Sequence, residues 1–205
     1  MNGLDLLLPA YCSGCGARGA ACCVSCLDGF GPPERIQVPG VGPPVWTLAA
    51  YDGAARELVL GFKERGARAL SAWFGAMVAA ALVVVGPRPW TLIPAPSRRT
   101  AARARGGDHM LRIAEAVHLA AVAPVLGFGA GVADSVGLNA TGRRANLAGR
   151  VEVHGRPPPG TTVLLDDVIT TGATAAASVR ALRKAGVRTH AVLVLTSARP
   201  ATGHA

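Results

Sequence analysis

The residues of this chain that are best suited to chemistry stand together between Thr161 and Thr174, where the sequence reads TTVLLDDVITTGAT. Two adjacent carboxylates, Asp166 and Asp167, follow a short apolar run. An ionised carboxylate only accepts hydrogen bonds, so a pair of them suits the neighbouring hydroxyls of a sugar. A Thr-Thr-Gly-x-Thr group comes next and offers hydroxyl donors together with a glycine that lets a ligand approach the backbone. The stretch therefore combines acceptors for a diol with donors for a phosphate.

The elements on either side of these residues are predicted to be a strand and a helix. Val163 to Leu165 is a β-rich apolar run of the kind that is buried on both faces of a sheet, and we expect it to end at the two carboxylates. Ala175 to Lys184 is rich in alanine and has high helix propensity. Amides at the start of such a helix lack internal partners and attract a phosphate group. The pattern indicates a cradle for a ribose 5-phosphate; the alternative is an ordinary strand–helix turn capped by threonines.

The run Val163 to Thr174 resembles the phosphoribosyl pyrophosphate (PRPP) signature of type I phosphoribosyltransferases, which is an apolar strand, two acidic residues and a Thr-Thr-Gly-x-Thr loop. The resemblance implies an α/β fold with a parallel-sheet core like that of the type I phosphoribosyltransferases. It also implies a set of PRPP-binding residues, which are Asp166, Asp167, Val168, Ile169, Thr170, Thr171, Gly172, Ala173 and Thr174. In this interpretation the loop holds the 5-phosphate and the two carboxylates hold the ribose 2- and 3-hydroxyls. Asp167→Asn is then expected to weaken PRPP binding and to leave the fold intact.

All five cysteines lie near the N-terminus, as two Cys-x-x-Cys pairs and one further residue. The pairs are Cys12 with Cys15 and Cys23 with Cys26, separated by seven residues. Each pair can direct two thiolates at one ion, and four thiolates complete the tetrahedral shell of a structural zinc. Cys23 is preferred to Cys22 as a ligand because it keeps the two-residue spacing to Cys26. The turns are supplied by Gly14, Gly16 and Gly19. A redox pair and a disulfide clamp are the alternatives.

Length and charge limit the classes of protein to be considered. A chain of 205 residues, half of them hydrophobic, fits one α/β domain with a small appendage. The net charge of +9 favours nucleic acid or phosphate ligands as partners. However, 19 of the 21 basic residues are arginine and the chain is rich in Ala, Gly and Pro, a bias that a GC-rich genome alone would produce. Aromatic residues are few, so a platform for stacking single-stranded bases is not indicated.

The sequence shows no targeting segment that we recognise. Met1 to Pro9 has no basic region and only a very short apolar run. Ala69 to Pro87 is free of charge, but it is largely Ala and Gly and closes on Gly86-Pro87, so a buried helix is favoured over membrane insertion. We therefore expect a cytoplasmic protein, where cysteines serve as metal ligands or thiols more often than as disulfides.

Five prolines between Gly31 and Pro44 indicate a semi-rigid linker. It divides the chain into a cysteine-rich zinc module and linker at residues 1–44 and a phosphoribosyltransferase-like domain at residues 45–205. The strands predicted in addition to Val163–Leu165 are Trp46–Tyr51, Trp90–Ile93, Ala121–Leu126, Val151–Val153 and His190–Thr196. The further helices are predicted at Gly53–Glu64 and Asp108–Leu119.

Two segments between these elements are candidates for ligand contact. A basic run follows the strand that ends at Pro94-Ala95-Pro96, and its arginines are Arg98, Arg99, Arg103 and Arg105. Guanidinium groups stay charged and bind pyrophosphate oxygens in pairs, although a solvated loop or a nucleic-acid patch would have the same composition. Gly127 to Gly142 is rich in glycine and is predicted to be a mobile lid, closing on Arg143, Arg144 and Asn146. The five histidines have no metal-ligand spacing and are interpreted as structural or exposed.

Taken in order, these pieces resemble the competence-protein ComF family, also described as predicted amidophosphoribosyltransferases. Besides the cysteine knuckle and the residues from Asp166 to Thr174, the matching pieces are Tyr51-x-Gly53-x-x-Arg56 with Lys63, Pro94-Ala95-Pro96 with Arg105-Gly106, and Gly137-Leu138 with Arg143 and Asn146. Three places differ. Gly107-Asp108-His109 stands where the family usually has Phe-Asn-Gln, Ser135 stands where Gln is usual, and Gly127 to Ala133 lacks the Arg and Thr residues commonly found there.

The resemblance implies individual roles for residues inside and outside the signature. Asp166, Asp167 and Arg105 are expected to be catalytic, and Arg103 and Lys63 are expected to join the PRPP-binding set. One Mg²⁺, bound mostly by substrate oxygens and water, would accompany PRPP. A nitrogen acceptor would receive the phosphoribosyl group, and the sequence does not identify it. The alternative function is a non-enzymatic PRPP- or nucleotide-binding protein that assists DNA uptake and binds single-stranded DNA or partner proteins.

Overall fold

The computed structural model describes residues 11–97, 107–129 and 151–200. Its centre is a six-stranded sheet in the spatial order β1-β2-β8-β7-β3-β4. Its strands are β1 (Glu34–Ile36), β2 (Val45–Thr47), β3 (Trp90–Pro94), β4 (Ala121–Val122), β7 (Thr161–Ile169) and β8 (Ala191–Ser197). The helices of the described residues are α1 (Val24–Leu27), α2 (Gly53–Glu64), α3 (Leu70–Val85), α5 (His109–Glu115) and α7 (Ala173–Lys184). Only the β1–β2 pairing of this sheet is antiparallel, so the predicted α/β class with a parallel sheet is confirmed.

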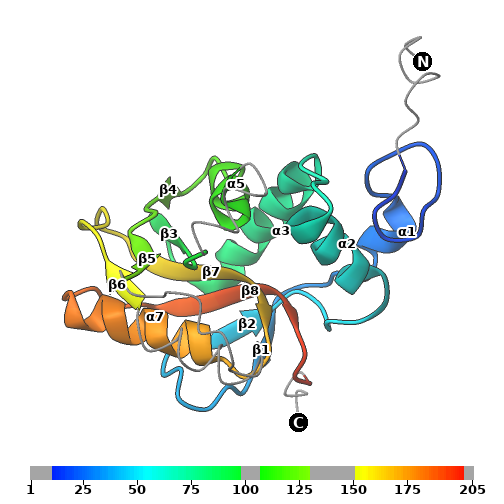
Figure 1. Cartoon of the computed structure of the whole chain (residues 1–205). Helices are drawn as coiled ribbons and strands as arrows, with labels where there is room; N and C mark the ends of the chain where they lie inside the picture. Colours follow the sequence, from blue (N-terminus) through cyan, green and yellow to red (C-terminus); the bar gives the residue numbers. More distant parts are fainter. Residues whose placement is uncertain (1–10, 98–106, 130–150, 201–205) are drawn as a thin grey trace, which may run out of the picture.

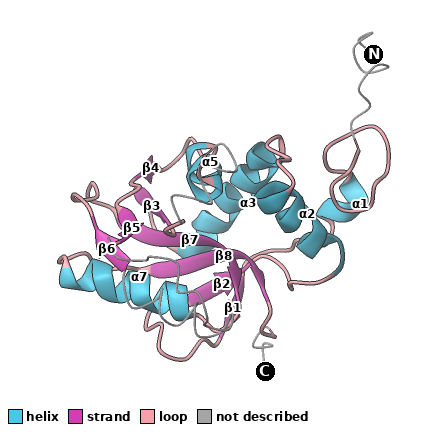
Figure 2. Cartoon of the chain, in the orientation of Figure 1, coloured by secondary structure: helices cyan, strands magenta, loops and turns pink. Residues whose placement is uncertain are grey.

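Helices cover both faces of the sheet. In Figures 1 and 2, α2, α3 and α5 lie on one face and α7 lies on the other. The apolar side chains of β7 alternate between the two layers: Val163 and Leu165 belong to the core beneath α3 and α5, and Leu164 belongs to the core against α7. A strand that is covered on both faces has no solvent side, which explains why this run contains no polar alternation.

The Pro-rich segment between Gly31 and Pro44 does more than link two parts of the chain. It contains β1, which pairs antiparallel with β2 and forms one edge of the main sheet. Val38 and Val41, which follow β1, are buried in the core on the α7 side. The boundary at residue 44 stays a prediction, but the segment that precedes it is part of the packed sheet.

Two predicted elements are shorter in the structure. The strand expected at Trp46–Tyr51 ends at Thr47, although Ala50 still forms an isolated parallel bridge with Ser197. The helix expected at Asp108–Leu119 ends at Glu115, and His118 adopts a positive φ of 33°, which a continuing helix does not allow. Helix α2 has the predicted bounds.

The uncharged segment from Ala69 to Pro87 folds into α3, as predicted. Its inner side chains, including Phe74 and Leu82, are fully buried, but Trp73, Val83 and Val84 on the outside are roughly half exposed or more. The helix is therefore buried along one side only. Among the residues that the structure describes, no helix is both long enough and apolar enough to cross a membrane.

The segment between β4 and β7 differs from the prediction. Ala121–Leu126 does not form one strand: β4 ends at Val122, and Leu126 begins β5 (Leu126–Phe128). β5 pairs antiparallel with β6 (Val151–Val153) in a separate two-stranded sheet. The lid predicted from Gly127 to Gly142 therefore begins inside a strand, and its residues from 130 onward lie outside the described part of the chain.

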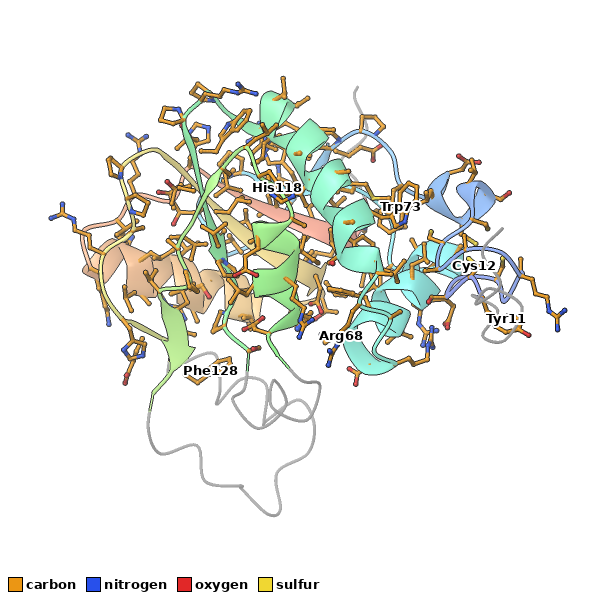
Figure 3. All side chains as sticks on the ribbon, turned by 90° about the horizontal axis from the view of Figure 1, so that it is seen from above. Tyr11, Cys12, Arg68, Trp73, His118 and Phe128 are labelled. Carbon is orange, nitrogen blue, oxygen red and sulfur yellow. The ribbon has the colours of Figure 1, made fainter. Side chains whose placement is uncertain are left out.

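The cysteine-rich module packs directly on the main domain. Cys12, Cys22 and Cys26 are buried in the same cluster as residues of α2 and α3. At Gly61 of α2 an added Cβ would lie 2.7 Å from Cβ of Ser13, so only glycine lets the module approach this closely. Figure 3 shows Cys12 beside α2.

Candidate active site at the carboxyl ends of the strands

The strand order reverses direction between β7 and β3. The chain passes from β3 through α5 to β4 on one side, and from β7 through α7 to β8 on the other. Because α5 and α7 cover opposite faces (Figure 1), a crevice opens at this point beyond the carboxyl ends of the strands, where open α/β sheets bind ligands. A cavity of about 540 Å³ lies there, lined by Tyr51 after β2, by residues 95–97 after β3, and by residues 166–175 of β7, the following turn and α7.

The two carboxylates lie inside β7, so the prediction that the strand ends before them is wrong. The ladder with β8 continues through Asp166, opposite Val194, and reaches Ile169. Successive residues of a strand point to opposite faces. Asp167 therefore points toward α2 and α5, and Asp166 points toward the face covered by α7. Both carboxylates nevertheless line the same cavity, so their joint hold on one diol stays a prediction.

Asp167 is buried and fully engaged by protein groups. Its Oδ2 accepts a hydrogen bond from Lys63 Nζ at 2.7 Å and is paired with His109 Nε2 at 2.9 Å. Its Oδ1 accepts from the Val168 amide at 2.8 Å. Burial by itself would raise the pKa of Asp167, but the hydrogen bond with His109 and the charge of Lys63 outweigh it and hold the pKa below its ordinary value. Burial likewise opposes the charge on Lys63, yet Asp167 outweighs it and raises the pKa of the ammonium group. Asp167 therefore organises the site.

Asp166 has a different environment. Its Oδ1 accepts from the Asp167 amide at 2.9 Å, and within the described residues Oδ2 has no protein partner. Burial, followed by the negative charge of Asp167, raises the pKa of Asp166 to about 8. Burial and the neighbouring negative charge therefore favour the protonated form of this carboxyl group. It can donate as well as accept a hydrogen bond, and it is the carboxyl group with an oxygen left for a ligand.

The turn after β7 presents the start of a helix to the cavity. Gly172 has φ of 80°, and a Cβ at this position would overlap the side chain of Val38, so both the turn and its packing require glycine. α7 begins at Ala173, two residues earlier than predicted, and the Ala173 amide donates to Thr171 Oγ1 at 3.3 Å. Ala173, Thr174 and Ala175, the first residues of α7, line the cavity. This end of α7 suits an anionic group.

His109 is a site residue that the sequence analysis assigned to a structural or exposed role. It is the first residue of α5, and Asp108 caps that helix by accepting from the amides of Met110 and Leu111 at 2.9 and 3.3 Å. The other oxygen of Asp108 accepts from Ser97 Oγ at 2.5 Å, so one side chain joins the segment after β3 to the start of α5. These residues fall where the chain departs from the ComF pattern. A histidine at the start of a predicted helix, after a loop at a strand end, was the available signal.

Of the other predicted residues, Lys63 is present in the site and contacts Asp167. Five remain predictions because they lie outside the described residues, and these are Arg103, Arg105, Arg143, Arg144 and Asn146. Phe128, at the end of β5, was not predicted and also lines the cavity.

The cysteine knuckle is the candidate metal centre. The sulfur atoms of Cys12, Cys15, Cys23 and Cys26, the four cysteines selected from the sequence, all lie within 4.8 Å of one another. The Cys15 and Cys23 sulfurs are 3.6 Å apart, close to the separation of two thiolates bound at about 2.3 Å to one tetrahedral zinc. These four residues could hold a metal ion. The fifth sulfur, of Cys22, is directed to the carbonyl oxygen of Cys23 at 3.7 Å.

Backbone groups favour the thiolate form of Cys12, whereas burial raises the pKa of Cys26. Burial would raise the pKa of Cys12, but hydrogen bonds from the amides of Cys23, Cys15 and Gly14 outweigh it and lower the pKa to about 6. Gly14 also lies so close to Cys26 that a Cβ would be 2.8 Å from its sulfur. Gly16 and Gly19, predicted as turn residues, have φ of 76° and 120°.

Two crystal structures of a hypoxanthine phosphoribosyltransferase from Staphylococcus aureus are similar to this chain. The orthorhombic form is 11% identical with a TM-score of 0.36, over 69% of this chain and 70% of that one. The tetragonal form is 12% identical with a TM-score of 0.36, over 70% of this chain and 71% of that one. No protein-family model and no curated protein matches the chain. The site is therefore interpreted from its own geometry.

Proposed function

We propose that this chain is a phosphoribosyltransferase-type protein that binds PRPP with Mg²⁺ and transfers the phosphoribosyl group to a nitrogen acceptor. One observation supports it above the others: a single cavity at the switch point of the sheet is lined by both a helix N-terminus and a carboxyl group with an oxygen left for a ligand. The first binds a phosphate through backbone amides, and the second suits a sugar hydroxyl. The resemblance of residues 163–174 to the PRPP signature agrees with this use.

In the proposed complex the turn from Thr170 to Thr174 and the first amides of α7 hold the 5-phosphate. Asp166 bonds a ribose hydroxyl through Oδ2. Asp167 holds Lys63 and His109 in place, and Lys63, which is still about one-third exposed, provides a positive charge beside the cavity. This differs from the interpretation in which both carboxylates hold the diol.

The proposed reaction exchanges one bond at C1 of the sugar. The C1–O bond to pyrophosphate breaks and its electron pair leaves with pyrophosphate, while the lone pair of the acceptor nitrogen forms the C1–N bond and the nitrogen then loses a proton. Charge grows on the departing pyrophosphate, and Arg103 and Arg105 are proposed to stabilise it. Mg²⁺, held mostly by substrate oxygens and water, would neutralise part of the pyrophosphate charge. The protein orients the reactants and excludes water.

The remaining assignments belong to the same proposal. The four clustered cysteines bind one structural zinc, which fixes the module formed by residues 1–44 onto the domain formed by residues 45–205. Arg143, Arg144 and Asn146 serve as lid residues. The protein acts in the cytoplasm, and the ComF resemblance supports a place among proteins of DNA uptake.

The direct test is the release of pyrophosphate from PRPP with Mg²⁺, in separate mixtures with ammonia, small amines and nitrogenous bases. We expect release with one class of acceptor. Thr174→Val removes a hydroxyl at the cavity and should lower PRPP affinity several-fold, whereas Thr189→Val, away from the cavity, should not. If calorimetry detects no PRPP binding with Mg²⁺, the proposal is wrong.

The alternative is a protein that binds PRPP or a nucleotide without turnover and contacts single-stranded DNA. The observation in its favour is the net charge of +9. PRPP binding without pyrophosphate release in any mixture would support it. Affinity for single-stranded DNA should then fall steeply as salt rises, because each phosphate contact releases counterions. A flat salt dependence would exclude such contacts.

A further inference from the structure

The turn that follows β7 is held from outside the cavity by the chain that follows β8. Arg199, two residues beyond β8, donates through Nε to the carbonyl oxygen of Thr170 at 2.9 Å. Thr170 lines the cavity, whereas Arg199, which the structure also describes, does not. The guanidinium group of Arg199 therefore contacts the turn on the side away from the cavity.

The backbone that carries Arg199 is itself fixed. Its amide donates to Ser197 Oγ at 2.9 Å, and that hydroxyl donates to the Arg199 carbonyl oxygen at 3.1 Å. Ser197 is 2% exposed, so its hydroxyl is largely shielded from water. The amide of Ala198 donates to the Ile169 carbonyl oxygen at 2.9 Å, which continues the pairing of β8 with β7 by one residue. The chain beyond β8 thus runs beside the chain that enters the turn (Figure 1).

The segment after β1 supports the same turn. Arg199 Nη1 donates to the Gln37 carbonyl oxygen at 3.4 Å, so one guanidinium group joins this segment to the turn. The next residue, Val38, packs against Gly172, where an added Cβ would overlap its side chain. The turn is therefore supported at Thr170 by Arg199 and at Gly172 by Val38.

The direction of a carbonyl group determines where the next amide points. In a planar trans peptide the C=O and the following N–H point in opposite directions. The Thr170 carbonyl oxygen faces Arg199, so the Thr171 N–H of the same peptide unit points away from Arg199. Arginine suits this role because its guanidinium group stays charged and presents several donors at fixed angles.

We infer that Arg199 is a positioning residue for the phosphate site at the start of α7. By holding the Thr170 carbonyl oxygen it directs the Thr171 amide toward the phosphate, so this donor is oriented before the ligand arrives. Arg199 contacts no ligand and acts only through the turn. The inference rests on the proposed function, because the phosphate is that of the proposed ligand.

The test measures the affinity of the full chain for PRPP with Mg²⁺ and for inorganic phosphate by calorimetry. Arg199→Met keeps an apolar stem and lacks the donors, so we expect both affinities to fall roughly tenfold. Arg199→Lys keeps a donor for one carbonyl oxygen and should stay within about threefold of wild type. Arg188→Met is the matched control, because Arg188 is exposed and precedes β8 at its other end, and it should leave both affinities unchanged.

Salt separates positioning from a simple effect of charge. Loss of a positive charge near a phosphate weakens binding less at high salt, because ions screen the interaction. Loss of an oriented amide should instead give the same ratio of wild-type to Arg199→Met affinity at about 50 mM and about 300 mM NaCl. A ratio that falls to one at the higher salt would assign a charge effect to Arg199 and overturn the inference.

A measurement without ligand separates this inference from the proposed function. Amide hydrogen exchange in residues 170–174 should accelerate roughly tenfold in Arg199→Met and not in Arg188→Met, while β7 keeps its protection. Unchanged exchange in the turn would show that Arg199 does not position it, and the inference would be wrong. If the wild-type chain binds neither PRPP nor phosphate, the proposed function is wrong, and the exchange rates still decide whether Arg199 orders the turn.

Discussion

Asp166 and Asp167 are neighbours in the sequence but have different chemistry because β7 directs them to opposite faces of the sheet. Asp167 meets a lysine and a histidine, which favour its ionised form, while Asp166 lies beside that negative charge and no cation from the described part of the chain contacts it. Adjacent carboxyl groups whose environments separate their pKa values are a common feature of sites that bind or transfer charged groups. The two carboxyl groups therefore do not have equivalent roles: Asp167 holds neighbouring side chains in place, and Asp166 has an oxygen left for a ligand.

The raised pKa of Asp166 predicts a pH dependence of stability. The pKa is 3.8 in an unfolded chain and about 8 in the folded protein, so the folded state binds more protons between these values. Stability from this group is complete below about pH 4 and is lost as pH rises toward 8. Asp166→Asn cannot ionise, so its free energy of unfolding, measured in urea from pH 5 to 8.5, should rise relative to wild type by at least about 1.4 kcal/mol, the equivalent of one pKa unit.

The exposed carboxylate Asp52 provides the control for this comparison. Asp52→Asn should change stability by a similar amount at every pH in the window. A constant difference between Asp166→Asn and wild type across the same range would contradict the predicted protonation of Asp166.

The cluster around Asp167 predicts a loss of stability that the sequence-based expectation for Asp167→Asn did not include. The neutral amide leaves the Lys63 ammonium without its partner, at a cost of about 2 kcal/mol, less than for a fully buried pair because Lys63 is partly solvated. The double variant Lys63→Met/Asp167→Asn should recover about 1 kcal/mol of this loss. Urea unfolding of the single and double variants gives the coupling energy.

The exposed ion pairs of Glu57 provide the control for the Lys63–Asp167 pair. Glu57 pairs with Arg56 at 2.6 Å and with Arg65 at 3.1 Å, and both arginines are about half exposed. Glu57→Gln should therefore lower the free energy of unfolding by no more than about 1 kcal/mol, as loss of an exposed pair does.

Additive effects of the Lys63 and Asp167 substitutions on the free energy of unfolding would show that the two side chains do not interact in solution.

Among the elements, α2 connects the cysteine knuckle to the site. It contacts the knuckle at Gly61 and through Arg65, which donates to the Ser13 carbonyl oxygen at 3.2 Å. Lys63, between them, reaches Asp167. A shift of α2 would therefore change both the packing of the cysteine knuckle and the position of Lys63 in the site.

Gly61→Ala tests this packing. The added methyl group would lie 2.7 Å from Cβ of Ser13, so the knuckle must move, and we expect a loss of about 1–3 kcal/mol in the free energy of unfolding. Gly31→Ala is the control, because a Cβ there has no atom within 4 Å and its backbone is not in the left-handed region. Equal stability of the two variants would show that the knuckle does not pack closely against Gly61 of α2.

Metal removal tests the same connection from the other side. We expect about one zinc per chain, since four sulfur donors complete one tetrahedral shell. After chelation, hydrogen exchange should accelerate in α2, while α7, on the opposite face of the sheet, keeps its protection. A purified chain that contains no metal and shows unchanged protection in α2 would contradict the prediction.

At the scale of the whole molecule, the site exists because two crossover connections leave β3 and β7 toward opposite faces of one sheet. Its walls come from both layers: Lys63 and His109 from one, and the start of α7 from the other. A ligand in this cavity must therefore stabilise the molecule as a unit.

PRPP with Mg²⁺ at 100 times its dissociation constant should raise the free energy of unfolding by about 2.7 kcal/mol, because it binds only the folded state. Thermal unfolding should shift upward in one transition, and hydrogen exchange should slow in both α2 and α7. Protection confined to one layer would show that the ligand does not occupy the crevice between them.

Local features of this protein were open to prediction because neighbouring residues determine them. The uncharged helix α3, the two Cys-x-x-Cys pairs and the glycine turn before α7 each follow from spacing and residue type over a short stretch. The ends of elements were less predictable. β7 continues past two aspartates, which are poor strand formers, because β8 pairs with it on both sides of Asp167, as far as Ile169.

The sequence by itself determined the strand–turn–helix unit around Gly172 and the identity of the four clustered cysteines. Only the tertiary structure decided that Asp167, rather than Asp166, meets His109, which is 58 positions away in the chain. Turns, helices and metal knuckles are governed by the conformational preferences and geometry of adjacent residues. Contacts between distant side chains depend on which strands become neighbours and which face each helix covers, and these are set by the packing of the whole core.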